Sequence, residues 1–429
     1  MISPKLKNIY FLLPRSLRVL VLRTYENYFA FKTAQKTKAQ LALKSNRQTN
    51  KRPKVLFFDL CGGGHGGTSK EMQILAKYLD KSKYDVYFMY SSKQAVNRIN
   101  VEGTLPTNGS TQRAKKLEEY GVKLIDFQYE SVNPEFPYII SGMNPNFFDV
   151  LKNKNIDILI VTTDGKSYFP FNLVRDIPII LLNVFGSYSV QKNISYNVGY
   201  TQELTDRINR VVDKKIIRQM YIPCEYPTPN SIEDGKALRN NLGIKDTDVV
   251  FGRIGRNVDA IFDTIGINAF KKIVAKYPEA HFLIVSPPPA LEKIVEEEKI
   301  PNVHLLPPTA SEEEIWAFHQ ANDVYAHFRK DGETFGLNIA EAMMCGKPII
   351  THRSFMWNGH LEYLEPAFSR VADIDDVEGY AKFMEEYIEI NKNGALKEVG
   401  LFAKTKAEKI FSPTNIINEF ELLIDSSIK

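Results

Sequence analysis

The feature that most constrains this chain is a repeated alternation of short apolar runs with amphipathic helical stretches. Two such series follow one another along the sequence. The apolar runs of the first series lie at 54–60, 84–90, 156–162 and 177–183, with a helical stretch at 68–79. Those of the second lie at 249–253, 281–285, 323–327 and 347–351, with helical stretches at 263–276, 311–320 and 336–345. Buried strands that alternate with helices form parallel sheets covered by helices. We therefore expect an α/β chain with two Rossmann-like, doubly wound domains.

The connection between the two series, over 219–245, is rich in proline, asparagine and aspartate, which is typical of a domain boundary. A chain of 429 residues is also too long for one ordinary hydrophobic core. We expect an N-terminal domain at 53–220 and a C-terminal domain at 221–410, facing each other across a cleft. A basic extension precedes them at 1–52, and a helix at 411–429 is expected to pack back on the N-terminal domain.

The basic extension holds twelve lysines and arginines and a single acid, Glu26, in a chain whose net charge is only +4. Its apolar residues Leu17, Leu20, Val21, Tyr25 and Tyr28 recur at helical spacing among the bases. Such a helix either lies on an anionic membrane surface or packs on the first domain with a solvated basic face. The acidic remainder of the chain argues against a nucleic-acid partner.

The cysteines and the hydropathy of the chain indicate its cellular compartment. Three cysteines lie far apart with no paired spacing, which favours a reducing compartment over a disulfide framework or a zinc site. The apolar stretch at 9–22 is interrupted by Pro14, Arg15 and Arg18, so neither a membrane span nor a signal peptide is expected. The chain is predicted to be cytoplasmic, with the basic extension as the part that could hold it peripherally on a membrane.

A glycine-rich segment at 61–69 stands between a predicted strand and a predicted helix. Its five glycines include Gly66 and Gly67, and its backbone amides could approach an anion at the helix N-terminus. The alternative is a flexible turn capped by Thr68 or Ser69. His65 in this segment is either a loop residue or a substrate contact, and Asp164 after the run at 156–162 either meets a sugar or forms a turn.

Charged residues follow two strands of the second series. Arg253 and Arg256 end the first of them and could bind diphosphate oxygens, or they could be solvated surface arginines. Glu333 lies in the loop after 323–327, and the amides of Thr334, Phe335 and Gly336 open the next helix, where an anion is favoured. Glu341 stands inside that helix between alanines, and a carboxylate in so apolar a stretch should have a partner.

These segments resemble glycosyltransferase family 4 and its GT-B relatives. The family shows Glu-x-Phe-Gly, a second Glu after seven residues, and Ala-Met-x-x-Gly-x-Pro, which stand here as 333–336, Glu341 and 342–348. The resemblance implies a retaining, metal-independent glycosyltransferase with a nucleoside-diphosphate sugar as co-substrate and no cofactor. It places Glu333 on the sugar hydroxyls and Arg253 or Arg256 on the leaving diphosphate. It implies that the donor is bound by Gly66, Gly67, Thr334, Phe335, Gly336, Leu337 and Glu341. Within this set Glu341 would accept hydrogen bonds from the ribose. His65 and Asp164 are the candidates on the acceptor side.

The sequence departs from the family at two places. A lysine about five residues after the Gly-Arg pair is missing, with Asn257, Val258 and Asp259 there instead, and Arg256 is the candidate replacement. A histidine after the run at 177–183 is also missing. The expected function is transfer of a sugar to a glycan, lipid-linked or protein acceptor in polysaccharide biosynthesis. A GT-B phosphorylase, a sugar-nucleotide epimerase, a non-catalytic sugar-binding protein and an NAD oxidoreductase are the alternatives.

Overall fold

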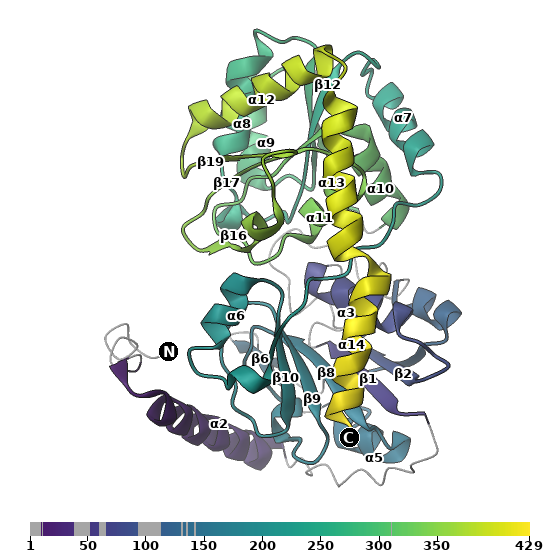
Figure 1. Ribbon diagram of the computed structural model, residues 1–429, viewed down its shortest axis with the longest axis vertical. Helices are drawn as coiled ribbons and strands as arrows, with labels where there is room; N and C mark the ends of the chain where they lie inside the picture. Colours follow the sequence, from purple (N-terminus) through teal and green to yellow (C-terminus); the bar gives the residue numbers. More distant parts are fainter. Residues whose placement is uncertain are drawn as a thin grey trace. The chain divides into compact units, whose positions relative to one another are not determined.

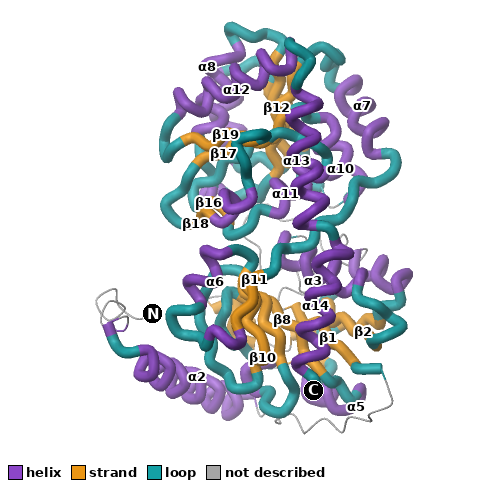
Figure 2. Tube along the Cα trace, viewed as in Figure 1, coloured by secondary structure: helices purple, strands orange, loops and turns teal. Residues whose placement is uncertain are grey.

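A computed structural model describes residues 10, 12–37, 52–59, 66–92, 113–129, 132–133, 136–140, 143–309 and 311–429 of the chain. The chain divides into two compact units, each built on one parallel sheet (Figures 1 and 2). The first unit takes in parts of the chain up to Tyr221 and returns at Ile416–Lys429, whereas the described residues of the second run over Ile222–Asn415. The predicted α/β class with two parallel sheets is confirmed.

The first unit is built on a seven-stranded sheet in the order β11-β10-β9-β8-β1-β2-β3. Its strands are β1 (Lys54–Asp59), β2 (Asp85–Tyr90), β3 (Lys123–Asp126), β8 (Ile158–Thr163), β9 (Ile179–Asn183), β10 (Ile194–Gly199) and β11 (Ile217–Gln219). Every neighbouring pair is parallel. The residues of β8 and β9 are all buried, so this sheet is covered on both faces, as continuous apolar runs predict.

The helices of the first unit are α2 (Arg15–Thr37), α3 (Gly67–Tyr78), α5 (Phe147–Lys154), α6 (Gln202–Ile208) and most of α14 (Pro413–Ser427). The unit also has the short pairs β4 (Gln128–Tyr129) with β7 (Met143–Asn144) and β5 (Val132–Asn133) with β6 (Phe136–Ile140), and the turns η1 (Leu117–Tyr120), η2 (Phe171–Leu173) and η3 (Lys214–Ile216). Helix α14 is tied to the sheet: the rings of Phe420 and Phe57 are 6.2 Å apart, and the Tyr84 hydroxyl donates to Asp425 at 2.7 Å.

The second unit is built on a six-stranded parallel sheet in the order β14-β13-β12-β15-β17-β19. Its strands are β12 (Val249–Ile254), β13 (Ala280–Val285), β14 (Val303–Leu306), β15 (Val324–Ala326), β17 (Ile349–His352) and β19 (Ser369–Ala372). The helices are α7 (Ser231–Asn241), α8 (Ile265–Val274), α9 (Pro289–Glu298), α10 (Glu312–Ala321), α11 (Leu337–Met344), α12 (Val377–Lys392) and α13 (Leu396–Phe411). The short strands β16 (Gly332–Glu333) and β18 (Trp357–Asn358) pair separately, and η4 (Asp259–Ile261) and η5 (Gly359–Tyr363) are single turns.

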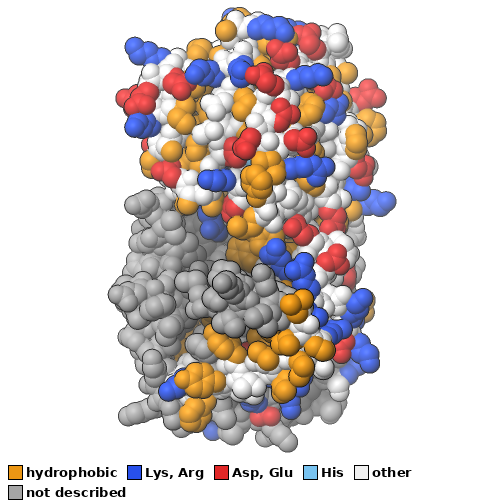
Figure 3. Space-filling view, turned by 90° about the vertical axis from the view of Figure 1, so that its left-hand side faces the viewer, with side chains coloured by type: hydrophobic (Ala, Val, Ile, Leu, Met, Phe, Trp, Pro, Cys, Tyr) orange, Lys and Arg blue, Asp and Glu red, His pale blue; other side chains and the backbone are white. Residues whose placement is uncertain are grey.

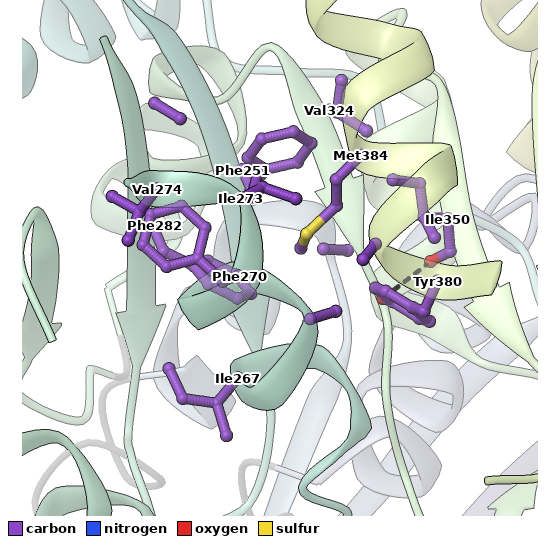
Figure 4. Packing of buried hydrophobic residues seen from close by; sticks show 14 of the residues in the cluster. Phe251, Ile267, Phe270, Ile273, Val274, Phe282, Val324, Ile350, Tyr380 and Met384 are labelled. Carbon is purple, nitrogen blue, oxygen red and sulfur yellow. Dashed lines mark hydrogen bonds between the residues drawn. The ribbon is translucent and has the colours of Figure 1, made fainter. Parts of the chain in front are cut away.

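The core of the second unit fixes the strand ends that carry the site. Phe251, Phe270 and Phe282 pack edge to face or tilted beside β12 and β13 (Figure 4). Tyr380 of α12 is fully buried, and its hydroxyl donates to the carbonyl of His327 at 3.0 Å. Because this bond lies in the core, the backbone just after β15 is held in place.

Helix α2 contacts the first unit with one face and exposes the opposite one. Its Ala30 joins the core, the Glu26 carboxylate accepts from the Val190 amide at 3.0 and 3.2 Å, and Arg15 donates to the Val212 carbonyl. The opposite face carries six large apolar side chains that are 45–59% exposed: Leu17, Leu20, Val21, Tyr25, Tyr28 and Phe31. Figure 3, which faces the side where α2 lies in Figure 1, shows hydrophobic side chains gathered over the lower part of that view. Among the described residues, no helix is long and apolar enough to cross a bilayer.

Candidate active site

Glu333 follows a glycine turn at the carboxyl side of the second sheet. Strand β16 pairs with β18 in parallel, so Gly332 lies opposite Trp357 and Glu333 opposite Asn358. Gly332 has φ +67°, and a Cβ there would lie 1.8 Å from the Trp357 carbonyl oxygen. Only glycine permits this approach, so the position of Glu333 depends on it.

The Glu333 carboxylate is held ionised by the side chains beside it. Its Oε1 lies 3.1 Å from Nη1 of Arg329 and 3.6 Å from Nε2 of His327. The other two nitrogens of the Arg329 guanidinium bind Asp331 at 2.6 and 3.0 Å. Burial would raise the pKa of Glu333, but Arg329 and His327 outweigh it and hold the pKa at about 2. A buried, ionised carboxylate is a strong acceptor for sugar hydroxyls.

Three buried histidines lie near Glu333 or its partner Arg329, and none of them was assigned a role from the sequence. His327 Nδ1 lies 2.9 Å from the Thr351 hydroxyl, which lies 3.1 Å from His360 Nε2. Burial lowers the pKa of His327, and it lowers that of His360 to about 3, so both rings are neutral at pH 7. His352 accepts from the Arg329 amide at 3.1 Å and has Nδ1 2.8 Å from the Arg353 carbonyl, which fixes its Nδ1–H tautomer.

Arg253 ends β12 as a buried cation with unused hydrogen-bonding capacity. It is 4% exposed, stacks on the Phe328 ring at 4.7 Å, and makes one long bond from Nε to the Phe328 carbonyl at 3.4 Å. Within the described parts of the chain its Nη1 has no hydrogen-bond partner. Burial lowers the pKa of Arg253, yet an arginine stays charged at neutral pH. An unsatisfied buried guanidinium favours an anion beside it. Arg256, by contrast, is exposed.

The start of α11 lies beside the end of β12. Gly336 caps the helix with φ +85°, and the Asn338 side chain donates to the Ile254 carbonyl at 2.8 Å. The Ile339 amide is bonded to the Gly336 carbonyl at 3.0 Å and to Asn338 Oδ1 at 3.1 Å, so the amides of Leu337 and Asn338 are the ones that this helix start offers to an anion. The Phe335 ring is buried against Tyr363 and Phe411, so only the backbone of Phe335 could face a ligand. Thr334 is buried as well.

Glu341, in the middle of α11, does have a partner. Its Oε2 lies 3.6 Å from Nε2 of His319 on α10, and both side chains are buried. A partner for this carboxylate was expected from the sequence, but His319 was not identified. The two residues come from different helices, and no spacing between them signals the pair.

The candidates of the first unit are described by themselves. His65 and the glycines before it lie outside the described residues, whereas Gly66 caps α3 and Gly67 begins it. Asp164 forms a turn, accepting from the Lys166 amide at 3.0 Å and the Tyr168 hydroxyl at 3.1 Å. A buried polar cluster lies where β1 and α3 meet: Ser69 donates to Asp59, and the Tyr200 hydroxyl donates to Glu71.

The described residues include no grouping of His, Cys, Asp and Glu that could hold a metal ion. The second unit contains an ionised carboxylate, Glu333, a buried arginine with an unsatisfied nitrogen, Arg253, and the N-terminus of α11. Together they suit a ligand with hydroxyl groups and a diphosphate.

Comparison with known proteins agrees with this chemistry. Residues 236–398 match the family model of glycosyl transferases group 1. No curated protein matches the chain. Anabaena HepE, solved in complex with UDP and glucose, is similar at 16% identity and a TM-score of 0.63, over 87% of this chain and 100% of its own.

Two further structures are similar to this chain, with sequence identities and TM-scores in the same range. A glycosyltransferase from Rickettsia africae has 14% identity and a TM-score of 0.65, over 89% of this chain and 99% of its own. Sucrose-phosphate synthase from Thermosynechococcus elongatus has 15% identity and a TM-score of 0.60, over 88% and 99%. At such identities the likeness concerns the fold, and the predicted GT-B architecture is confirmed.

Proposed function

We propose that this chain is a retaining glycosyltransferase that uses a nucleoside-diphosphate sugar, since residues 236–398 match the family model of glycosyl transferases group 1. The acceptor would be a glycan, a lipid-linked saccharide or a protein, and polysaccharide biosynthesis the setting. The observation that carries this proposal is that one unit holds both an ionised carboxylate, Glu333, and a buried guanidinium with an unsatisfied nitrogen, Arg253.

We assign roles by charge. Glu333 accepts hydrogen bonds from the hydroxyls of the donor sugar and fixes its orientation. Arg253 and the N-terminus of α11 bind the diphosphate and stabilise the charge that develops as it leaves. Arg256, exposed in the structure, is the weaker candidate for this role. Glu341 would accept from the ribose.

For the reaction we propose attack on the face that the diphosphate leaves. The acceptor hydroxyl forms the new bond to the anomeric carbon while the bond to the diphosphate oxygen breaks. The hydroxyl proton passes to the departing diphosphate, so the configuration is retained without a protein nucleophile. Cationic side chains and the α11 N-terminus would serve at the leaving group where other enzymes use a metal ion.

The test begins with the donor. A thermal-shift panel of nucleotide sugars should include UDP-glucose, because HepE has been solved with that compound. A ligand at 100 times its dissociation constant stabilises by about 2.7 kcal/mol, so one binding donor should stand out. No shift with any nucleotide sugar would contradict the proposal.

The second step is Glu333→Gln, with the exposed Glu378→Gln on α12 as control. Glu333→Gln should abolish transfer but retain binding of the nucleoside diphosphate, since Arg253 and α11 are intact. The control should transfer normally. An unchanged rate in Glu333→Gln would overturn the site assignment, and donor binding without transfer to any acceptor would favour a non-catalytic protein.

We also propose that α2 holds the enzyme on an anionic membrane surface, as a peripheral protein on the cytoplasmic side. Helix α2 packs on the first unit through Ala30 and Glu26, so its apolar face stays available. Arg15, Arg23 and Lys32 are exposed on the same helix, and its only acid is engaged with Val190. An apolar face accompanied by bases suits the headgroup region of an anionic bilayer.

Vesicle flotation tests this contact. The protein should float with vesicles of phosphatidylglycerol and phosphatidylcholine, and much less with phosphatidylcholine alone. Leu20→Asp with Phe31→Asp should abolish flotation. The matched control is Leu401→Asp with Phe402→Asp, an exposed apolar pair on α13. Equal flotation of both double variants, or a dimer in solution that the α2 variant dissociates, would overturn the membrane assignment.

A further inference from the structure

The two contacts on the Glu333 carboxylate converge on one oxygen. Arg329 Nη1 lies 3.1 Å from Oε1, and His327 Nε2 lies 3.6 Å from the same atom. Because both side chains approach Oε1, Oε2 is left to accept from a donor-sugar hydroxyl. The orientation of the carboxyl plane therefore depends on what His327 presents to Oε1.

His327 can present either a proton or a lone pair, and its other nitrogen decides which. A neutral imidazole has one N–H and one bare nitrogen. His327 Nδ1 lies 2.9 Å from the Thr351 hydroxyl, and Thr351 is fully buried. When Thr351 donates to Nδ1, the ring proton must sit on Nε2 and face Glu333.

His360 is the third member of this set, and its Nε2 lies 3.1 Å from the Thr351 oxygen. When His360 Nε2–H donates to Thr351, the hydroxyl hydrogen is free to point at His327 Nδ1, and every donor points toward Glu333. The reverse direction would set a bare Nε2 lone pair of His327 against an anionic carboxylate, which is repulsive.

We propose that His360, Thr351 and His327 form a positioning chain that fixes the tautomer of His327 and so orients Glu333 for the donor sugar. None of the three touches the reacting atoms, so they are positioning residues. The chain joins three separate elements, the end of β15, the strand β17 and the turn η5. This inference rests on the proposed function, because it concerns the carboxylate that would meet the sugar.

The matched test is Thr351→Val against Thr351→Ser. Valine has the shape of threonine without the hydroxyl, whereas serine keeps the hydroxyl and loses a methyl group. The readout is calorimetric affinity for UDP-glucose and for UDP, or for the corresponding pair if the panel names another donor. Thr351→Val should weaken nucleotide-sugar binding about three- to tenfold, the effect of one hydrogen bond, and leave the nucleoside diphosphate unaffected. Thr351→Ser should restore wild-type affinity for the sugar.

A second pair covers the case in which Thr351→Val does not fold. His360→Gln keeps an N–H donor near the position of Nε2, whereas His360→Leu removes it. The glutamine variant should retain the affinity increment due to the sugar, and the leucine variant should lose it. Equal increments within both pairs would overturn the positioning chain while leaving the proposed function standing. If the wild type binds no nucleotide sugar, the proposed function fails first.

Discussion

A buried carboxyl in the first unit should make the stability of this protein depend on pH in an unusual direction. Glu71 on α3 is completely buried, the Tyr200 hydroxyl donates to its Oε2, and among the described residues its Oε1 has no hydrogen-bond partner. Burial raises the pKa of Glu71 to about 8, against 4.5 for an ordinary glutamate. The folded protein therefore holds a proton at pH 7 that the unfolded chain releases.

The sign follows from proton linkage. The folded pKa lies above the unfolded one, so the stabilising contribution is complete below pH 4.5 and is lost as the pH rises toward 8. Between pH 5 and pH 8 the loss amounts to about 3 to 4 kcal/mol, at about 1.4 kcal/mol per pH unit over most of that interval. Glu71→Gln keeps the shape of the neutral acid and cannot ionise, so it should remove this dependence.

The assay is urea unfolding at pH 5 and pH 8, followed by circular dichroism because both tryptophans, Trp316 and Trp357, lie in the second unit. The wild type should lose stability relative to Glu71→Gln as the pH rises. Glu119→Gln, at an exposed position in η1, serves as control and should behave as the wild type. The same change in stability between the two pH values in wild type and Glu71→Gln would refute the reasoning.

Three further perturbations have expected outcomes. Arg253→Met should weaken nucleoside-diphosphate binding about ten- to hundredfold in calorimetry, because it removes charged hydrogen bonds to the ligand. Gly332→Ala should lower the melting temperature and weaken sugar binding together, since the added Cβ would clash with the Trp357 carbonyl at 1.8 Å. His319→Leu should destabilise by about 1 kcal/mol in urea unfolding, because it removes the contact between His319 and the Glu341 carboxylate, and adding Glu341→Gln should recover part of that loss.

The parallel sheets could be predicted because their strands are continuous apolar runs closed by glycine, proline or charge. The run predicted at 249–253 is β12, at Val249–Ile254, and that at 347–351 overlaps β17. Residues that follow such strands lie at the carboxyl edge of the sheet, where ligands bind. That rule is enough to place Arg253 and Glu333 in one region from the sequence alone.

The histidines around Glu333 could not be predicted in this way. His327, Thr351 and His360 come together only because β15 and β17 are neighbours and η5 returns beside them. Nothing in their sequence spacing encodes that proximity. Phe335 shows a second limit, because the motif indicates that phenylalanine belongs at the helix start without distinguishing a ligand contact from a ring packed on Tyr363.

Amphipathic periodicity also failed to find Glu71. In the helix predicted at 68–79, the apolar residues Met72, Leu75, Ala76 and Leu79 recur at helical spacing and form one face, which leaves Glu71 on a polar side. In the structure Ser69 through Ala76 are all buried. A helix enclosed on several sides buries polar residues that a two-faced pattern assigns to solvent.

The chain enters the second unit near Ile222 and leaves it near Asn415, and these two ends are bonded to each other. The Cys224 amide donates to the Phe411 carbonyl at 2.9 Å, and the hydroxyls of Tyr226 and Ser412 are 3.2 Å apart. The unit is thus an insertion that closes on itself. It could be circularly permuted, with a short linker across the old ends and new termini at the exposed turn of Gly394. Grafting the unit into a related chain would need two cuts, one in each of the two segments that are hydrogen-bonded to each other near Cys224 and Phe411.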